Sequence, residues 1–368
     1  MAHHDVVVMA ASAGGIETLR EVFGGLPVDL NAAVLVVVHM PPTGGRALPG
    51  ILGRMTDLPV RAARDGEALE PGRVYVCVAD HHLLVGQGHV HVRRGPRENG
   101  HRPAADPLFR SAAGYYGPRV VGVVLSGTLS DGTAGLYAVR QQGGTAVVQD
   151  PADALYSSMP ATALENVGAD HVASARDLGP LIGQLVKDDA GTRPEPPGEE
   201  LRREVALMES DDSVLSEHHP GTPSAWPCPD CSGVLWAIND GPLLRFRCRV
   251  GHAWSAESLL HEQGKGVEAA LWMALRALED RAALSQTLAE RAEQAGRPIS
   301  AGRLRQDLGD MSRSLEVLRH LLASGQAAGD PAASDSAGSD SAGSDSAASD
   351  SAASDSAVLD DATGEHRP

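Results

Sequence analysis

The feature that most constrains this chain is a series of five short, almost wholly apolar runs in its first half. Each run is rich in valine and too short to form a helix of ordinary length. The runs are Val6–Ala10, Val34–Val38, Val74–Val78, Val120–Leu125 and Thr145–Val148. Runs of this kind are typical of strands that are buried on both faces of a parallel sheet.

Helical patterns separate several of these runs. They occupy Ile16–Phe23, Leu48–Met55 and Ala134–Gln142. The alternation of strand and helix predicts an α/β domain with a doubly wound, mostly parallel sheet, which we place at residues 1–190. Aromatic residues make up only 3% of the chain, so its core must consist mainly of aliphatic side chains.

The second half of the chain has a different composition and is expected to fold in smaller pieces. Residues 191–225 are rich in proline, glycine and acidic residues and are predicted to be a linker, with a short helix near Leu201–Met208. Residues 226–255 contain clustered Cys and His residues, and residues 256–325 carry two runs of helical periodicity that predict an antiparallel hairpin. Residues 326–368 repeat SDSAG or SDSAA and are predicted to be a disordered acidic tail.

The charge of the chain argues against nucleic-acid binding. The formal net charge is −17, although residues 326–368 alone hold nine acidic residues and one arginine, which leaves about −9 for the rest. Binding to nucleic acid requires a basic face. No apolar run approaches the roughly 18 residues that span a membrane, and no basic segment precedes the first apolar run as it would in a signal peptide. We therefore expect a cytoplasmic protein without membrane insertion.

The four cysteines indicate a metal site and not a disulfide framework. Cys228 and Cys231 are separated by two residues, and Cys248 and His252 follow after a gap of sixteen residues. Three thiolates and one imidazole make a complete tetrahedral set for a structural zinc ion, arranged as in a zinc ribbon. No ligand position remains for water, so we expect a structural role. Cys77 lies within a predicted strand and is expected to be an inert core residue.

Three polar residues follow predicted parallel strands and are expected to meet at one edge of the sheet. Ser12 precedes two glycines and a helix, His39 directly follows the second strand, and Asp131 lies in a glycine-containing loop before a helix. A nucleophile, a base and a carboxylate on the same edge match the logic of a serine hydrolase triad. Each residue also has a simpler interpretation: Ser12 as a helix cap or part of a phosphate loop, His39 as a structural histidine, and Asp131 as a helix cap.

A resemblance to a known family favours the hydrolase interpretation. The chain resembles the catalytic domain of the chemotaxis receptor methylesterases, the CheB-type protein-glutamate methylesterases, in a stand-alone form without a receiver domain. The matching segments, which span nearly all of residues 5–185 in the family's order, are ASAGGIE, VVVHMPP, RDGEALEPGRVYV, GHRPAADPLFRSAA, LSGTLSDGTAG and SSMPATALENVGA.

The resemblance implies an activity and a role for each residue. Ser12 would be the nucleophile, His39 the general base and acid, and Asp131 the residue that orients the histidine, with backbone N–H groups of Ala13 and Thr128 as oxyanion donors. The substrate would be a glutamyl methyl ester on a methyl-accepting chemotaxis receptor or similar signalling protein, and catalysis would need no cofactor. The loop departs from the family pattern at Thr128 and Leu129, where the family has methionine and glycine.

Two other functions stay open at this stage. A weakened esterase scaffold would act as a signalling interaction module, with the zinc ribbon and helices as its docking part. A protein-glutamine deamidase would use the same triad. The expectation that the chain has no receiver domain also motivates the hypothesis that the region after residue 195 covers the active site, in which case its deletion should raise activity.

Overall fold

The computed structural model describes residues 3–192, 196–209 and 221–328, and its first half contains the expected α/β sheet. Seven strands, all parallel, are arranged in the order β3-β4-β2-β1-β7-β8-β9. They are β1 (Val6–Ala11), β2 (Ala33–Val38), β3 (Val60–Ala62), β4 (Arg73–Val76), β7 (Val120–Val124), β8 (Thr145–Gln149) and β9 (His171–Ala173). The five strands predicted from the apolar runs are confirmed, while β3 and β9 add one short strand at each edge.

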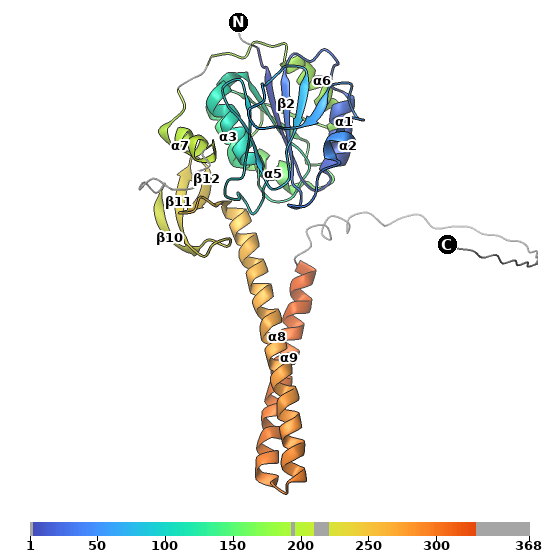
Figure 1. The fold of residues 1–368 in the computed structure, drawn as a ribbon, viewed down its shortest axis with the longest axis vertical. Helices are drawn as coiled ribbons and strands as arrows, with labels where there is room; N and C mark the ends of the chain where they lie inside the picture. Colours follow the sequence, from blue (N-terminus) through green and yellow to red (C-terminus); the bar gives the residue numbers. More distant parts are fainter. Residues whose placement is uncertain (1–2, 193–195, 210–220, 329–368) are drawn as a thin grey trace, which may run out of the picture. The chain divides into compact units, whose positions relative to one another are not determined.

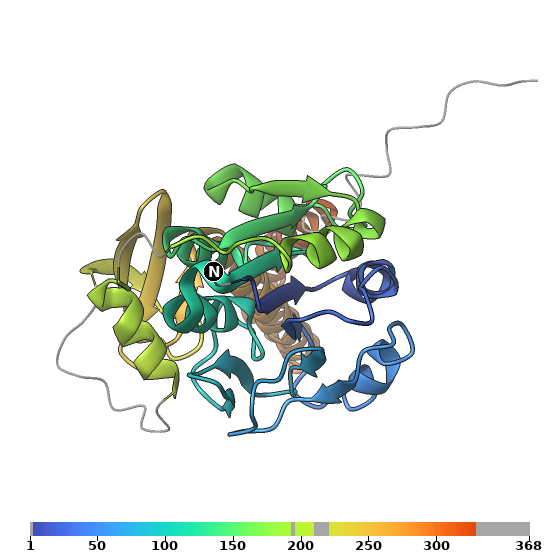
Figure 2. The same ribbon diagram turned by 90° about the horizontal axis from the view of Figure 1, so that it is seen from above.

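Helices cover both faces of this sheet (Figure 1). One face carries α1 (Gly15–Gly24), α2 (Leu48–Leu52) and α6 (Ala175–Leu185). The other carries α3 (Ala105–Tyr116), α4 (Thr133–Gln141) and α5 (Ser158–Val167), with a short 3-10 turn at Gly117–Arg119 after α3. Seen from above, α1 and α3 lie on opposite sides of the sheet (Figure 2). The predicted doubly wound fold is therefore confirmed.

The alternation of side chains along β1 explains why its run is apolar throughout. Val6, Val8 and Ala10 pack into the core under α3 and α4. Val7, Met9 and Ala11 pack into the other core, under α1 and α6. Because successive side chains of a strand point to opposite faces, a strand between two helix layers must be apolar at every position.

A β-hairpin and a second, antiparallel sheet accompany the parallel sheet. Strands β5 (His82–Val85) and β6 (Val90–Arg93) form an antiparallel hairpin against α3. After α7 (Glu199–Glu209), a four-stranded antiparallel sheet is formed by β10 (Thr222–Pro227), β11 (Val234–Asp240), β12 (Leu243–Cys248) and β13 (Ala253–Ser255). We call β10–β13 the Cys/His module. Its first strand begins four residues before the segment 226–255 that the sequence suggested.

Two long helices follow the module. They are α8 (Ala256–Gln294) and α9 (Pro298–Ala328), joined by a three-residue turn. Leu275 of α8 packs with Leu315 and Leu322 of α9, so the two helices pair as the periodicity predicts. The predicted tail lies outside the described residues from 329 onward. Among the residues that the structure describes, no helix combines the length and apolar character that crossing a membrane requires.

Candidate active site

The structure brings Ser12, His39 and Asp131 together at one edge of the sheet. Ser12 follows β1, His39 follows β2 and Asp131 lies in the loop after β7. These three strands are neighbours, because β1 pairs with β2 on one side and with β7 on the other. Parallel strands end at the same edge, so the order of the strands alone places the three side chains within reach of one another.

The three side chains form a continuous hydrogen-bonded relay. His39 Nδ1 lies 3.1 Å from Ser12 Oγ, and His39 Nε2 lies 2.6 Å from Asp131 Oδ2. The side chains of His39 and Asp131 are 7% and 1% exposed. A buried carboxylate that fixes the imidazole, and an imidazole that contacts a serine hydroxyl, are the parts that activate a serine as a nucleophile.

The Asp131 carboxylate is held in its ionised form by several donors. Its Oδ2 also accepts a hydrogen bond of 2.6 Å from the N–H of Ala105, at the start of α3. Its Oδ1 accepts a 3.0 Å hydrogen bond from Asn99 Nδ2 and a weaker one, at 3.3 Å, from the N–H of Asp106. Burial by itself would raise the pKa of Asp131, but the contacts with His39 and the Ala105 N–H outweigh it and lower that pKa. Asp131 is therefore a stable anion opposite His39.

Glycines allow the backbone to close around Ser12. The N-cap of α1, Gly14, has φ +68, a left-handed conformation that favours glycine. A Cβ on Gly127 would lie 2.8 Å from Ser12 Cβ and 2.6 Å from Met159 Sδ. The loop after β7 therefore approaches Ser12 so closely that only glycine fits at position 127.

The predicted oxyanion donors lie on either side of this approach. Among the described residues, neither the N–H of Ala13 nor that of Thr128 has a hydrogen-bond partner. Unpaired N–H groups beside a nucleophile are the donors that an anionic intermediate requires. The next residue, Leu129, has φ +65, and its N–H binds Ser158 Oγ at 3.0 Å. Leu129 thus adopts a backbone conformation that glycine would take without strain.

Two residues of the site were not singled out from the sequence. His101 stacks on His39, with ring centroids 3.8 Å apart and an interplanar angle of 9°. Burial, and next the charge of His39, lower the pKa of His101 to about 4, so it forms a neutral platform for the His39 ring. Asn99 contacts Asp131 directly. His101 lies in the GHRPAAD segment that carries the resemblance, which is the one sequence signal that pointed to this loop.

A hollow of about 370 Å³ opens beside His39. Its walls come from the segment after β2 and from the loop before α3, and include Met40, Pro41, Arg97 and His101. Arg97 has no acidic partner among the residues that the structure describes. The described residues that line this hollow lie between positions 39 and 102, so none of the described residues after position 195 forms its walls.

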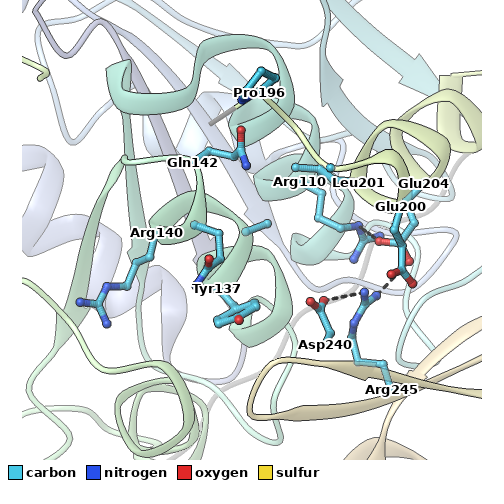
Figure 3. A pocket seen from close by; sticks show the side chains of 13 residues that line it. Arg110, Tyr137, Arg140, Gln142, Pro196, Glu200, Leu201, Glu204, Asp240 and Arg245 are labelled. Carbon is cyan, nitrogen blue, oxygen red and sulfur yellow. Dashed lines mark hydrogen bonds and ion pairs between the residues drawn. The ribbon is translucent and has the colours of Figure 1, made fainter. Parts of the chain in front are cut away.

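A larger hollow, of about 730 Å³, lies elsewhere, between α3, α4, α7 and the Cys/His module (Figure 3). Several of its charged side chains pair with each other: Arg245 binds Glu204 at 3.0 Å and Asp240 at 2.7 Å. None of the triad residues lines it. It is a crevice along the junction of the two regions and not a candidate site.

The four predicted metal ligands also come together. The ligand atoms of Cys228, Cys231, Cys248 and His252 all lie within 4.8 Å of one another. Cys231 Sγ is 3.6 Å from Cys248 Sγ, and His252 Nδ1 is 3.5 Å from Cys248 Sγ. Ligands at about 2.3 Å from a tetrahedral zinc ion are separated by about 3.8 Å. The Cys₃His cluster therefore fits a zinc ion in size and in donor chemistry.

Comparison with known proteins agrees with the geometry of the first half. Residues 7–182 match the protein family described as CheB methylesterase. A Caulobacter vibrioides protein named protein-glutamate methylesterase/protein-glutamine glutaminase 2 is 38% identical over 192 residues, which cover 50% of this chain and 55% of that relative. A Pyrococcus horikoshii protein named protein-glutamate methylesterase/protein-glutamine glutaminase is 36% identical over 185 residues, covering 49% of this chain and 50% of its own length. The chain thus spans about half the length of the curated relatives it matches.

Among solved structures, the chain is similar to the Thermotoga maritima CheB methylesterase catalytic domain. The two are 32% identical with a TM-score of 0.48, and the match covers 50% of this chain and 100% of that one.

Proposed function

Residues 7–182 form a CheB methylesterase domain, and on this premise we propose that the chain hydrolyses glutamyl methyl esters on chemoreceptor-like signalling proteins. The observation that carries the proposal is the relay from Ser12 through His39 to Asp131 at the ends of three adjacent strands. The names of the relatives supply the substrate class, since they include protein-glutamate methylesterase.

The proposed reaction has two halves. Ser12 Oγ attacks the ester carbonyl carbon while its proton passes to His39 Nδ1, and the negative charge of Asp131 stabilises the imidazolium. The N–H groups of Ala13 and Thr128 bind the oxyanion of the tetrahedral intermediate. Methanol leaves with the proton from His39. Water then attacks the acyl-serine with His39 as base, which releases the glutamate side chain and regenerates Ser12.

A structural zinc ion in the Cys₃His cluster is part of the proposal. Cys228, Cys231, Cys248 and His252 would hold it, and it would cross-link the ends of β10, β12 and β13 in a module with a small apolar core. No catalytic step depends on it. Metal-binding thiols, together with the free and buried Cys77, suit the reducing cytoplasm, where we place the protein.

The decisive experiment measures methanol release from a carboxyl-methylated chemoreceptor fragment. Wild-type protein should release methanol, and Ser12→Ala should not. Ser312→Ala, which removes a hydroxyl on α9 that contacts only its own helix, serves as the matched control and should retain activity. If the wild type releases no methanol from several methylated receptors, the proposal fails, and a role as a signalling interaction module replaces it.

A second activity is favoured by the names of the relatives, which pair the methylesterase with protein-glutamine glutaminase. The same serine would attack a glutamine side-chain amide and release ammonia in place of methanol. Ammonia release from an unmethylated receptor fragment that retains its glutamines tests this activity. Its loss in Ser12→Ala, but not in Ser312→Ala, would assign it to the same site.

A further inference from the structure

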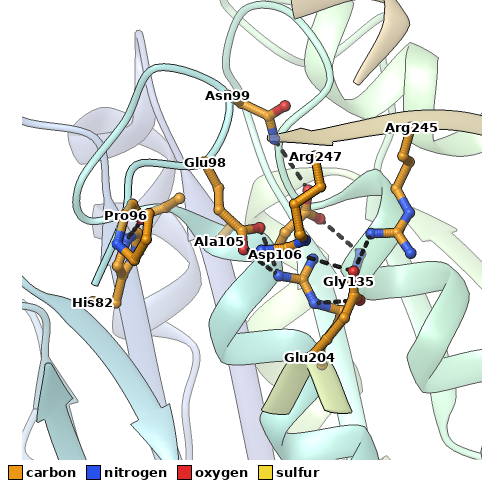
Figure 4. Close-up of polar contacts among 12 residues, drawn as sticks. His82, Pro96, Glu98, Asn99, Ala105, Asp106, Gly135, Glu204, Arg245 and Arg247 are labelled. Atoms are coloured by element: carbon orange, nitrogen blue, oxygen red, sulfur yellow. Dashed lines mark hydrogen bonds and ion pairs between the residues drawn. The ribbon is translucent and has the colours of Figure 1, made fainter. Parts of the chain in front are cut away.

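Asn99 lies between the triad carboxylate and the Cys/His module. Its Nδ2 donates hydrogen bonds to Asp131 Oδ1 at 3.0 Å and to Asp106 Oδ2 at 3.1 Å. Its Oδ1 accepts a hydrogen bond of 2.8 Å from the N–H of Ser255, the last residue of β13. Figure 4 shows this amide at the edge of a group of buried charged side chains. Both amide hydrogens and the amide oxygen are therefore used, and two of the three contacts go to carboxylates.

The backbone of the module is joined to the same loop. The N–H of Asn99 donates to the carbonyl oxygen of Ala253 at 2.8 Å, and the N–H of Ala253 donates to the carbonyl oxygen of Arg97 at 3.2 Å. Ser255 Oγ lies 2.6 Å from Ser130 Oγ, one residue before Asp131. Strand β13 therefore contacts the loops that carry both Asn99 and Asp131.

Buried ion pairs hold this junction together (Figure 4). Arg110 of α3 binds both oxygens of Glu98 at 2.6 Å and contacts Glu204 of α7 at 3.2 Å. Arg247 of β12 contacts Glu98 at 3.2 Å and Glu204 at 3.0 Å. These side chains are nearly inaccessible to solvent. Separating the two regions would break the ion pairs of Arg247 and Arg110 across the junction, so opening the junction would be costly.

The orientation of the Asn99 amide matters for the triad. Asp131 Oδ2 is engaged by His39 and Ala105, whereas Oδ1 receives its one side-chain donor, among the described residues, from Asn99. A reversed amide would turn its oxygen toward two carboxylates and its NH₂ group toward the Ser255 N–H. The donor from Ser255 thus allows only the orientation that also holds the triad carboxylate.

We propose that Asn99 is a positioning residue for ester hydrolysis, and that the Cys/His module fixes it through the backbone N–H of Ser255. The module is then a structural part of the active site, added from the other end of the chain. This inference takes its reaction, ester hydrolysis, from the proposed function. The alignment that it describes concerns only Ser12, His39 and Asp131. The sequence had suggested that the region after residue 195 covers the site and that its deletion raises activity. The present inference predicts the opposite result, namely that deletion of this region lowers activity.

The first test removes the Asn99 side chain. Asn99 has φ +53, so Asn99→Gly deletes the amide without introducing backbone strain. We expect kcat to fall roughly 10- to 100-fold, because the carboxylate that aligns His39 loses a constraint on its rotation. KM should stay within about twofold. A protein that only lost stability would show a lower melting temperature with kcat and KM unchanged when measured well below it.

The second test removes the contact from the module side. Ser255 has φ −72 and follows an extended residue, so proline fits there and deletes the N–H. Ser255→Ala is the matched variant, because it also loses the hydroxyl that contacts Ser130 and caps α8, but keeps the N–H. We expect Ser255→Pro to lower kcat about tenfold more than Ser255→Ala does. Equal kcat values in the two folded variants would overturn the inference, and if Ser255→Pro does not fold, Asn99→Gly decides alone.

A readout without a receptor separates this inference from the proposed function. The rate at which a fluorophosphonate labels Ser12 reports the competence of the triad whatever the natural substrate is. If the wild type is labelled but releases no methanol, the methylesterase proposal fails. The inference is still supported if Asn99→Gly is labelled more slowly than the wild type, and Ser255→Pro more slowly than Ser255→Ala. Equal labelling of all folded variants overturns it, and absence of labelling in the wild type overturns both.

Discussion

The α/β domain and the Cys/His module are stabilised by different kinds of interaction. Between the two layers of helices, the central strands of the α/β domain are apolar at nearly every position, and the burial of aliphatic side chains holds the fold. The module has a core of only a few apolar side chains, among them Leu235, Phe246 and Trp254. We expect it to depend instead on the proposed metal at its Cys₃His cluster and on buried ion pairs of Arg247 with Glu98 and with Glu204 of α7. We therefore expect the α/β domain to stay folded when a single side chain is changed. The module is expected to lose much of its stability when one member of an ion pair or of the Cys₃His cluster is removed.

The largest effect is expected from a change that leaves both regions folded. Asp131→Asn keeps the size of the side chain but removes the charge that stabilises the imidazolium of His39, so kcat should fall by about 10⁴. Methanol release and circular dichroism would be measured together. Asp170→Asn, at a partly exposed carboxylate, is the control and should change kcat little. A loss of less than tenfold in Asp131→Asn would argue against the triad.

The next largest effect should come from the junction. Glu204→Gln leaves Arg110, Arg245 and Arg247 with too little negative charge, and we expect a loss of about 3 to 5 kcal/mol in the free energy of unfolding of the module. All four tryptophans, at positions 226, 236, 254 and 272, lie in the second half of the chain. Urea unfolding followed by tryptophan fluorescence therefore reports on this half.

The control for that experiment is Glu199→Gln. Glu199 forms an exposed pair with Arg203 on the same helix, α7, and its loss should change stability by less than about 0.5 kcal/mol. Similar destabilisation by the two substitutions would mean that the buried ion pairs do not hold the module.

Removal of the metal should affect the module and spare the sheet. Because the module has a small core, we expect a chelator to lower the melting temperature seen by tryptophan fluorescence by roughly 10 °C. Amide hydrogen exchange of the buried strands β1, β2 and β7 should stay as slow as in the metal-loaded protein. Zinc content measured by mass spectrometry should be about one ion per chain, and lost in Cys248→Ala but not in Cys77→Ala. A protein purified without any bound metal that melts in one transition would contradict this distinction.

A pH dependence should separate the two carboxylates that share Asn99. Burial, and next the charge of Asp131, raise the pKa of Asp106 from 3.8 to about 7. Because the folded protein binds this proton more tightly than the unfolded chain does, protonation of Asp106 stabilises the fold. This stabilisation is fully present below about pH 4 and is lost as the pH rises toward 7. Asp131 acts in the opposite sense, because its pKa is lowered, and its contribution is present above about pH 4 and lost in more acidic solution.

Asp106→Asn isolates the first of these contributions. Relative to the wild type, the free energy of unfolding of Asp106→Asn should increase from pH 4 to pH 7, by at most about 1.4 kcal/mol for each pH unit. Urea unfolding at a series of pH values measures the difference. A difference that does not vary with pH would show that Asp106 is ionised throughout this range.

The smallest effect is expected in the loop beside Ser12. Leu129 has φ +65, so Leu129→Gly should relieve strain and stabilise the folded protein by about 1 kcal/mol. Thermal unfolding is the measurement. Leu155→Gly, at an exposed leucine with no such conformation, is the comparison and should not stabilise. A destabilised Leu129→Gly would mean that contacts of the leucine side chain outweigh its backbone strain.

The sequence predicts the parts of this molecule in which neighbouring residues determine the structure. The central strands are evident because a fully buried strand must be apolar throughout. Strands β3 and β9 have three residues each and are only partly buried, so no comparable pattern marks them. The helices of the hairpin follow from periodicity, although Val267 and Leu284 of the predicted runs are largely exposed.

The candidate site divides in the same way. Ser12, His39 and Asp131 are recognisable because each directly follows a strand or lies in the loop after one, and neighbouring parallel strands end together. Asn99 and His101 lie in an irregular loop whose path depends on tertiary contacts. The pairing of Glu98 with Arg247 joins residues 149 positions apart, and no periodicity or spacing predicts such a contact.

The bond between Asn99 and Ser255 joins residues separated by 156 positions, which has a consequence for biosynthesis. Translation at 5–20 residues per second takes roughly 8 to 30 s to cover that interval. For most of this interval, once residue 131 has been added, the nascent chain contains Ser12, His39 and Asp131, but the strand that contacts Asn99 has not been made. On the proposed role of Asn99, the order of synthesis thus delays the final alignment of Ser12, His39 and Asp131 until residue 255 has left the ribosome.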